Sequence, residues 1–290
     1  MIKIIKALYL FANILIIAAL LTLHFFVKEY NHYISIYFYL FPLPVIIAIV
    51  LVLSIFLGKL KKYNLMLAAL LCLVWLSRSF RISFDSEIKE TDLEVVFWNA
   101  SRENSFEDVF LDLEKIPDVM VLTETKGNNF NDLHKKYPDY YFYKSKKELQ
   151  IFSKTPMQII KEGSSNHNST VVHFKTSGVH FFAVDMMGSY DVPKSWEFNF
   201  ANPEINKTTN AIVLGDFNVP LESFFLRRFK QDFNHAFLKK GNGFVETWPN
   251  NIPLLSLDHI WVSKDLEILK TEKINTLKSD HSMLRAFIKQ

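Results

Sequence analysis

The chain has 290 residues, 49% of them apolar, a formal net charge of +3 and a single cysteine, so it has room for one large domain or two small ones. Residues 1–93 carry nine Lys and Arg against five Asp and Glu, which leaves 24 basic and 25 acidic residues in 94–290. The C-terminal part is therefore almost neutral. This argues against a broad basic face that binds nucleic acid through many phosphates.

The first third of the chain is strongly apolar. Residues 7–27 and 33–58 contain no charged side chain, and each exceeds the roughly 20 residues that a helix needs to cross a bilayer. A third apolar segment, near residues 63–80, is short for a span. A cleaved signal peptide could account for the first segment, and buried core helices could account for all three. Because the segments lack a polar face, we expect an all-α transmembrane region of about three helices in 1–84, with the second kinked at Pro42 and Pro44.

The basic residues near the span ends predict the orientation, since cytoplasmic loops hold the excess of Lys and Arg. One side would carry five of them and the other side four: Lys3, Lys6, Lys59, Lys61 and Lys62 against Lys28, Arg78, Arg81 and Lys89. This small difference favours a cytoplasmic N-terminus. With three spans, we expect an integral membrane protein whose domain after residue 84 is extracytoplasmic. The lipid bilayer is then a partner. Cys72 lies within the third span, so the rest of the chain has no thiol for a disulfide.

Residues 85–93 are polar and predict a short linker, after which residues 94–290 alternate short β-rich runs with a few helical ones. Ser105 and Asp108 form a capping-box pattern ahead of a helix. A second helix is expected near 222–232. The predicted strands lie near 93–100, 118–125, 140–145, 149–154, 157–163, 169–176, 179–187, 211–218, 258–264, 266–274 and 282–288. This order predicts an α/β (α+β) domain in which two sheets pack together with helices outside.

Polar residues stand at or near the ends of several predicted strands: Asn99, Glu124, Asp216, Asn218, Asp258, Asp280 and His281. Each alone could be an ordinary turn or cap residue. Together they indicate a site, because loops at strand ends converge in space. Carboxylate and amide oxygens suit Mg²⁺ or Mn²⁺, whereas a single histidine lacks the partners expected at a zinc site.

Seven motifs in order give the sequence a resemblance to the endonuclease/exonuclease/phosphatase family, which includes deoxyribonuclease-like nucleases and bacterial sphingomyelinases. They are FWNA, VLTET, LQIFSK, LGDFN, GFVETWP, LDHIWVS and SDHSML, between residues 97 and 284. The resemblance implies a four-layer αββα sandwich over 94–290. It also implies a metal-dependent hydrolase of a phosphodiester, either nucleic acid or a phospholipid headgroup. No protein partner can be inferred.

The resemblance also assigns roles to the strand-end residues. It places the divalent metal, Mg²⁺ or Mn²⁺, on Glu124, with Asn99 and Asp280 near it. The catalytic groups that it implies are His281, Asp258, Asp216 and Asn218. Asp258 would orient His281, which would contact the phosphate or relay a proton, while Asp216 and Asn218 would position the attacking water. His259 is expected to be a structural neighbour, and His167, His173, His180 and His235 are expected at the surface or in packing.

Two departures from the family pattern leave an alternative open. Met187 aligns where family members usually carry a histidine or another polar group, and a thioether cannot donate a hydrogen bond to phosphate. Asp185, Ser189 or Tyr190 could take that role if the register slips. The segment 189–210 also looks too short for the helix that the family places before LGDFN. The alternative is a catalytically degenerate member that acts as a binding or scaffold module.

Overall fold

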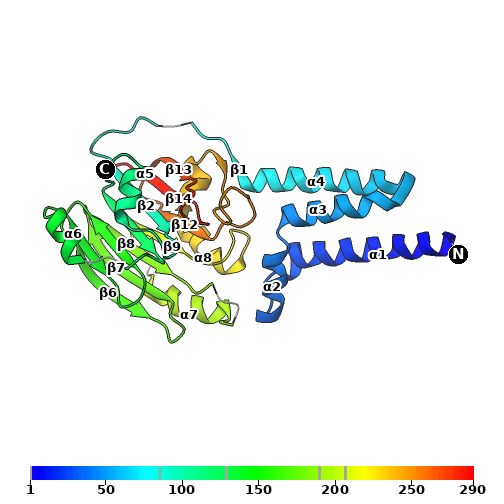
Figure 1. Cartoon of the computed structure of the whole chain (residues 1–290), viewed down its shortest axis with the longest axis horizontal. Helices are drawn as coiled ribbons and strands as arrows, with labels where there is room; N and C mark the ends of the chain where they lie inside the picture. Colours follow the sequence, from blue (N-terminus) through cyan, green and yellow to red (C-terminus); the bar gives the residue numbers. More distant parts are fainter. Residues whose placement is uncertain (1, 85, 128–129, 189–190, 206–207) are drawn as a thin grey trace. The chain divides into compact units, whose positions relative to one another are not determined.

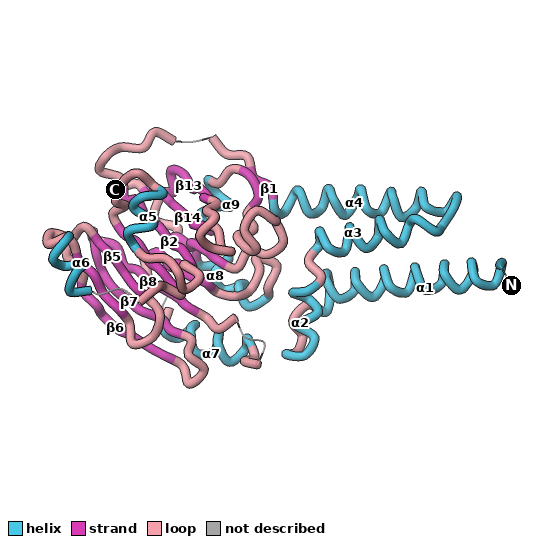
Figure 2. The backbone as a smooth tube through the Cα atoms, viewed as in Figure 1, coloured by secondary structure: helices cyan, strands magenta, loops and turns pink. Residues whose placement is uncertain are grey.

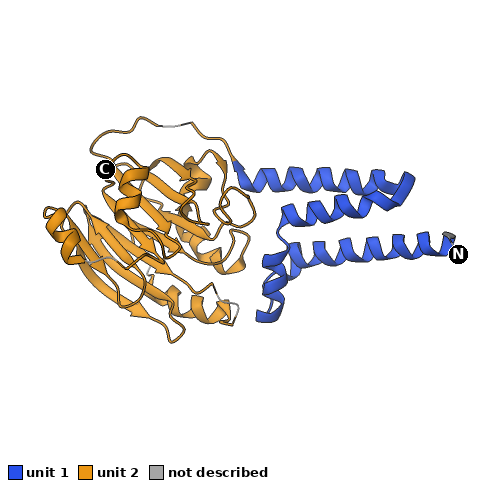
Figure 3. Cartoon of the chain, in the orientation of Figure 1, with its two compact units in different colours: residues 1–80 blue, residues 81–290 orange. Residues whose placement is uncertain are grey.

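The computed structural model describes residues 2–84, 86–127, 130–188, 191–205 and 208–290. The chain divides into two compact units, residues 1–80 and 81–290 (Figure 3). Ser189 and Tyr190, which the sequence offered as alternatives to Met187, lie outside the described residues.

The first unit is helical. Its elements are α1 (Ile2–Thr22), the π-helix η1 (Leu23–Val27), α2 (His32–Leu40), α3 (Leu43–Ser54), the 3₁₀ segment η2 (Ile55–Leu60) and α4 (Lys61–Ser79). Two helices, Lys3–Val27 and Leu43–Ser79, are long and apolar enough to cross a membrane. Only 22% of each apolar window is buried inside the protein, which is little for the core helix of a soluble domain.

The predicted second span, 33–58, is divided in the structure. Helix α2 ends before Phe41 and Pro42, and α3 begins at Leu43, because proline lacks the N–H that would continue the helix. At Gly58 the backbone adopts φ 55° and ψ −124°, and the chain reverses so that α3 and α4 lie side by side (Figure 1). The apolar stretch Leu43–Ser79 thus contains two helices that lie side by side, and the number of membrane spans stays a prediction.

The second unit contains two six-stranded sheets. The first has the order β10 (Phe233–His235), β12 (Asp258–Ser263), β9 (Ala211–Asp216), β8 (Val179–Asp185), β7 (Thr170–Thr176), β6 (Gln158–Ser164). The second has the order β13 (Ile268–Ile274), β14 (Met283–Ile288), β2 (Leu93–Asn99), β3 (Val119–Thr123), β5 (Gln150–Ser153), β4 (Tyr141–Lys144). Neighbouring strands are antiparallel except for the pairs β8–β9 and β2–β3, which are parallel.

The central strands are buried on both faces, as their nearly continuous apolar sequences require. In β2, Val95 and Phe97 point into the core between the sheets, whereas Val96 and Trp98 point outward and pack beneath α5 (Phe106–Asp112). Helix α6 (Phe130–Lys136) packs on the same outer face through Leu133. The flanking helices and the two sheets form the predicted αββα sandwich (Figure 2).

The outer face of the other sheet carries α7 (Lys194–Glu204) and α8 (Arg227–Asp232), with the short segment η3 (Phe224–Leu226). The short helix α9 (Ala236–Lys240) follows β10 and contacts β12 and β13. Aromatic rings join α7 and α8 to the sheet: Phe198 and Phe229 both contact Phe217, and Phe229 contacts Trp261. Helix α7 corrects one expectation, because the segment 189–210 does hold a helix before LGDFN. That departure from the family pattern disappears.

The start of the second unit is attached to its own surface. Strand β1 (Phe80–Arg81) pairs with β11 (Gly243–Phe244). Ser83 then donates from its backbone N–H to Asn242 Oδ1 at 2.7 Å. In the predicted linker, Ser86 accepts a hydrogen bond from Lys240 Nζ at 2.9 Å. The described residues of this polar segment are therefore held by hydrogen bonds to the sandwich.

Candidate active site

The polar strand ends meet at one edge of the sandwich. The parallel pairs β2–β3 and β8–β9 bring Asn99, Glu124, Asp185 and Asp216 to the C-terminal ends of their strands. Strand β12 runs in the opposite direction, so its first residue, Asp258, pairs with Asp216. The parallel strands end, and the antiparallel strand β12 begins, at the same edge, so residues far apart in sequence become neighbours.

Gly215 allows the strands to approach closely just before Asp216. A Cβ added at this position would lie 1.9 Å from the carbonyl oxygen of Val184 on β8. No side chain fits there, so the glycine of the LGDFN motif is required for β8 and β9 to keep Asp185 and Asp216 in register.

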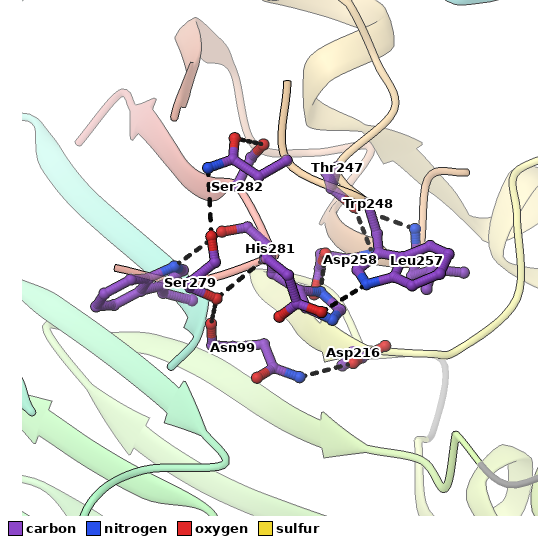
Figure 4. A network of polar contacts seen from close by, with 12 residues as sticks. Asn99, Asp216, Thr247, Trp248, Leu257, Asp258, Ser279, His281 and Ser282 are labelled. Atoms are coloured by element: carbon purple, nitrogen blue, oxygen red, sulfur yellow. Dashed lines mark hydrogen bonds and ion pairs between the residues drawn. The ribbon is translucent and has the colours of Figure 1, made fainter. Parts of the chain in front are cut away.

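Three buried groups form the centre of the site (Figure 4). Asp258 Oδ2 lies 2.9 Å from His281 Nδ1, and both side chains are buried. One ligand atom from each of Asp216, Asp258 and His281 lies within 4.8 Å of the others. Asn99 Nδ2 donates to Asp216 Oδ2 at 3.1 Å, which joins the two sheets across the site. Asn99, Asp216 and Asp258 lie on three different strands and His281 lies in the loop before β14, yet the four residues form one polar cluster.

Burial and mutual charge shift the protonation of this cluster. Burial raises the pKa of Asp216 to about 7, with the neighbouring Asp258 carboxylate adding to the effect. Burial alone would lower the pKa of His281, but Asp258, Asp216 and Asp280 raise it to about 10. At neutral pH His281 is therefore an imidazolium held by Asp258, and Asp216 is poised to gain or lose a proton.

The residues expected to hold a metal lie beside this centre. Asn99 Nδ2 also donates to Glu124 Oε1 at 3.2 Å, and Asn99 Oδ1 accepts the backbone N–H of Ser101 at 3.1 Å. Glu124 directly follows β3 and has φ 46°, a conformation uncommon for a residue with a side chain. Its other oxygen, Oε2, lies 3.3 Å from Nε of the exposed Arg102.

Asp280 completes the set from the SDH motif. Its carboxylate accepts hydrogen bonds from Ser101 Oγ and from Trp248 Nε1, the latter at 2.9 Å. Burial alone would raise the pKa of Asp280, but these hydrogen bonds and the nearby His281 lower it overall, so the carboxylate is charged at neutral pH. Ser279 Oγ donates to the backbone oxygen of Asn99 at 2.8 Å, which fixes the SDH loop to the end of β2.

The donor chemistry of this set fits a hard divalent cation. Glu124 and Asp280 provide carboxylate oxygens, and Asn99 provides an amide group that contacts Glu124 directly and Asp280 through Ser101. A second indication is Asp258 Oδ1, which is buried and has no hydrogen-bond partner among the described residues. Buried carboxylate oxygens normally accept a hydrogen bond or bind a cation, so Asp258 Oδ1 is an acceptor that a bound group would satisfy.

Asn218 is held in a turn after β9. Its backbone N–H donates to Asp216 Oδ1 at 2.8 Å, and its Nδ2 donates to the carbonyl oxygen of Met186 at 2.7 Å. The backbone is in the left-handed region, with φ 50°, which asparagine tolerates better than most residues. The turn ties the end of β9 to the chain that leaves β8.

Asp185 ends β8 and stands in register with Asp216, whereas Met187 is two residues beyond the strand. Burial raises the pKa of Asp185 well above its usual value, and Asp216, Glu124 and Glu148 add to the shift. Asp185 thus faces the acidic centre, as the slipped register allowed. Met187 is half-buried, its N–H donating to Glu197 Oε1 at 2.7 Å and its carbonyl accepting from Lys194.

Sequence reasoning missed the residues that position this site. Trp248, Ser101 and Ser279 were not singled out, although Trp248 lies in GFVETWP and Ser279 begins SDHSML. The buried Lys194–Glu197 pair, at 2.7 Å, was also missed, because lysine and glutamate at i and i+3 on a helix usually form a surface pair. The pair is connected to the site through its hydrogen bonds to the backbone of Met187.

His259 and His235 form a buried chain behind the site. His259 Nε2 lies 3.0 Å from the carbonyl oxygen of Val219, and His259 Nδ1 lies 3.1 Å from His235 Nε2. Leu238 N–H donates to His235 Nδ1 at 3.3 Å. These partners are consistent with both rings being neutral and carrying their protons on Nε2. His259 is therefore a packing neighbour that holds the chain just after Asn218.

Comparisons with known proteins identify the family and the fold of the chain. Residues 96–281 match the model of the Endonuclease/Exonuclease/phosphatase family. Among solved structures, a 3′ phosphatase, NExo, from Neisseria bound to a product DNA hairpin has a TM-score of 0.54 at 15% identity, covering 67% of this chain and 98% of that one. Humanized TDP2 from D. rerio has a TM-score of 0.53 at 15% identity, covering 69% and 100%.

A third solved structure, an endonuclease/exonuclease/phosphatase from Bacteroides vulgatus, has a TM-score of 0.51 at 18% identity, covering 69% of this chain and 99% of that one. At these identities the structures show the fold alone. No curated protein matches the chain. The family match nevertheless covers well over half of the sequence and includes every strand-end residue of the site, from Asn99 to His281. The chain belongs to the endonuclease/exonuclease/phosphatase family.

Proposed function

We propose that the chain is a membrane-anchored, divalent-metal-dependent phosphoesterase that hydrolyses a phosphodiester. The observation that carries the proposal is the buried cluster in which Asp258 holds His281 at 2.9 Å while Asn99 holds Asp216 at 3.1 Å. Burying ionisable groups in an apolar interior lowers the stability of a fold. Clusters of such groups with shifted pKa values are therefore typical of functional sites.

Glu124, Asn99 and Asp280 would hold Mg²⁺ or Mn²⁺. The bound cation would neutralise phosphoryl oxygens and stabilise the leaving oxygen. The support for this ligand set is its oxygen chemistry and its linkage through Asn99 and Ser101. Arg102, paired with Glu124, lies at the same place and would add positive charge near the substrate.

The proton chemistry falls to the buried cluster. His281 has its Nδ1 fixed by Asp258, so its Nε2–H is left to donate to a phosphate oxygen or to the leaving group. Asp216, with its pKa raised to about 7, would accept a proton from the attacking water. Asn218, held by Asp216 and Met186, would orient that water or the phosphate.

The membrane anchor rests on the helices Lys3–Val27 and Leu43–Ser79. We propose that the chain crosses the membrane three times, so that a cytoplasmic N-terminus, which the Lys and Arg distribution favours, places the second unit outside the cytoplasm. The substrate would be nucleic acid or a phospholipid headgroup. The solved complexes of NExo with a DNA hairpin and of D. rerio TDP2 with single-stranded DNA product support the first class. The near-neutral charge of residues 94–290 favours the second.

A substrate panel on the full-length chain in detergent tests the proposal. Bis-p-nitrophenyl phosphate, duplex and single-stranded DNA, and phospholipid in mixed micelles would be incubated with Mg²⁺, with Mn²⁺ and with chelator. The proposal expects hydrolysis of at least one phosphodiester that chelator abolishes and added metal restores. Binding of Mg²⁺ without turnover of any member would instead indicate the scaffold module that Met187 left open.

A further inference from the structure

The loops that border Asp280 expose apolar side chains. Leu277 is 99% exposed and Ile252 is 56% exposed. Leu277 lies three residues before Asp280, and Ile252 lies two residues after Asn250, whose backbone N–H donates to the Asp280 carbonyl at 2.6 Å. We call the segments 249–254 and 275–279 the rim loops.

The rim loops are joined to each other, so their apolar tips form one surface. Asn250 Nδ2 donates to the carbonyl oxygens of Thr276 and Ser279, and Asn275 Nδ2 donates to Asn251 Oδ1 at 3.0 Å. Exposed leucines that are scattered singly over a surface need no explanation. Leu277 and Ile252 differ because they stand on loops that are hydrogen-bonded to each other and that border Asp280 of the site.

The charge next to Leu277 is already compensated. Lys278 Nζ lies 2.9 Å from Asp112 and 3.6 Å from Asp108, both on or beside α5. An ammonium group that is paired in this way costs less to bring toward an apolar medium than a free one. The rim loops therefore present aliphatic tips without an adjacent uncompensated cation.

The covalent path keeps the rim loops near the point where the chain enters the second unit. Arg81 belongs to β1, which pairs with β11, and β11 ends at Phe244. Four residues later Trp248 donates to Asp280. Extended backbone covers at most about 3.5 Å per residue, so Phe244 and Trp248 lie within about 14 Å of each other. Arg81 follows Ser79, the last residue of the candidate span Leu43–Ser79, by two residues.

From these observations we propose that the rim loops dock against a phospholipid bilayer. Leu277 and Ile252 enter its apolar edge, and the site takes the phosphodiester of a lipid headgroup. Aliphatic side chains gain free energy on leaving water, and a bilayer is the apolar phase that a membrane-anchored chain always has within reach. The choice of substrate rests on the proposed hydrolase function, whereas the docking surface does not.

A labelling experiment tests the docking surface alone. In full-length protein carrying Cys72→Ser, a polarity-sensitive dye is attached at Leu277→Cys, at Ile252→Cys or at the control Ile160→Cys, and each protein is reconstituted in phosphatidylcholine vesicles with nitroxide-labelled lipid. Ile160 is 44% exposed on β6, at the opposite edge of its sheet from β12 and β10. Dye at 277 and 252 should be quenched at least about twofold more than dye at 160, as expected for side chains below the headgroups. Equal quenching at the three positions would overturn the proposal.

A kinetic comparison tests the substrate. Leu277→Asn and Ile252→Asn should lower phosphatidylcholine hydrolysis in the same vesicles by about tenfold, because the loops no longer present the lipid. The same variants should leave hydrolysis of soluble bis-p-nitrophenyl phosphate unchanged, and Ile160→Asn should change neither rate. Equal losses on both esters would overturn the lipid assignment. If the wild type hydrolyses neither ester, the proposed function fails, and the quenching result still decides whether the rim loops dock.

Discussion

His281 is the residue on which the proposed proton chemistry depends most. Its ring is buried, and Asp258 fixes one nitrogen at 2.9 Å, so the other nitrogen has a defined direction. The nearby carboxylates raise its pKa to about 10, which keeps it charged through the neutral range. A charged donor of fixed direction suits a phosphate oxygen or a leaving group better than a freely rotating histidine.

We expect His281→Ala to reduce turnover of bis-p-nitrophenyl phosphate by about 10²- to 10⁴-fold at saturating metal, the usual contribution of a general acid or base. His134→Ala, which removes an exposed histidine from α6, serves as the matched control and should retain the wild-type rate. Initial rates and circular dichroism would be measured on both variants. A folded His281→Ala protein with a wild-type rate would remove His281 from the mechanism.

The His235–His259 chain predicts a loss of stability in acid. Burial lowers the pKa of His259 to about 4 from an unfolded value near 6.5. Because the folded pKa is the lower one, the unfolded state binds the proton first as pH falls. The stabilising effect of the neutral ring is complete above pH 6.5 and is lost toward pH 4, by up to about 3 kcal/mol.

His259→Gln isolates this effect, because its amide can still donate to the Val219 carbonyl but does not titrate. The variant should be less stable than wild type at pH 7 and should lose less stability between pH 6.5 and 4. Melting temperatures of the two proteins over this range provide the measurement. Parallel pH profiles would show that His259 is not the titrating group.

At the scale of secondary-structure elements, β8 and β9 approach each other closely at Gly215. We expect Gly215→Ala to destabilise the second unit by about 1–3 kcal/mol, because its Cβ would overlap the Val184 carbonyl and push the strands apart. Gly127→Ala is the control, since nothing lies within 4 Å of an added Cβ there, and it should change stability by less than about 0.5 kcal/mol. Thermal unfolding compares them. An unchanged melting temperature in Gly215→Ala would contradict the strand spacing.

The sequence predicted elements well where periodicity or a motif was local. The polar ends of β2, β3 and β9 could be placed because each follows an uninterrupted apolar strand. Helix α7 was missed because its sequence, KSWEFNFANPE, has weak helix formers and a proline in its last turn. The register of Asp185 could not be settled from sequence, since the pairing of β8 with β9 is a non-local contact.

Residues that position the site through contacts between distant segments could not be predicted from sequence either. Trp248 binds Asp280 and Ser279 binds the end of β2, and neither pairing has a periodic signal. The apolar segments at the N-terminus were recognised, and the number of membrane spans that they form stays a prediction. Pro42 was expected to kink one helix, whereas two helices, α2 and α3, meet there. The reversal at Gly58 lies where the second predicted span ends.

For the whole molecule, the orientation in the membrane is the prediction most open to test. A cytoplasmic N-terminus follows from five Lys and Arg against four at the span ends, and the three predicted spans then place the second unit outside. A phosphatase reporter that works only outside the cytoplasm, fused after Gln290, should be active, and a reporter that fluoresces only in the cytoplasm should be dark. The reverse pattern would place the candidate active site inside the cell.

The central claim, that a metal held by the strand-end residues drives phosphodiester hydrolysis, is tested most directly by Glu124→Gln. The change replaces an anionic ligand with a neutral amide of the same shape, so Mg²⁺ binding should weaken. Glu267→Gln is the matched control, because Glu267 is exposed and pairs with Lys289 at 2.8 Å on the surface.

The measurement is the initial rate of bis-p-nitrophenyl phosphate hydrolysis by the full-length proteins across a Mg²⁺ titration. We predict that Glu124→Gln lowers the rate at least about 100-fold at the Mg²⁺ concentration that half-saturates the wild type. Glu267→Gln should follow the wild-type curve. A Glu124→Gln protein that follows the wild-type curve as well, or a wild-type rate that chelator leaves intact, would contradict the account.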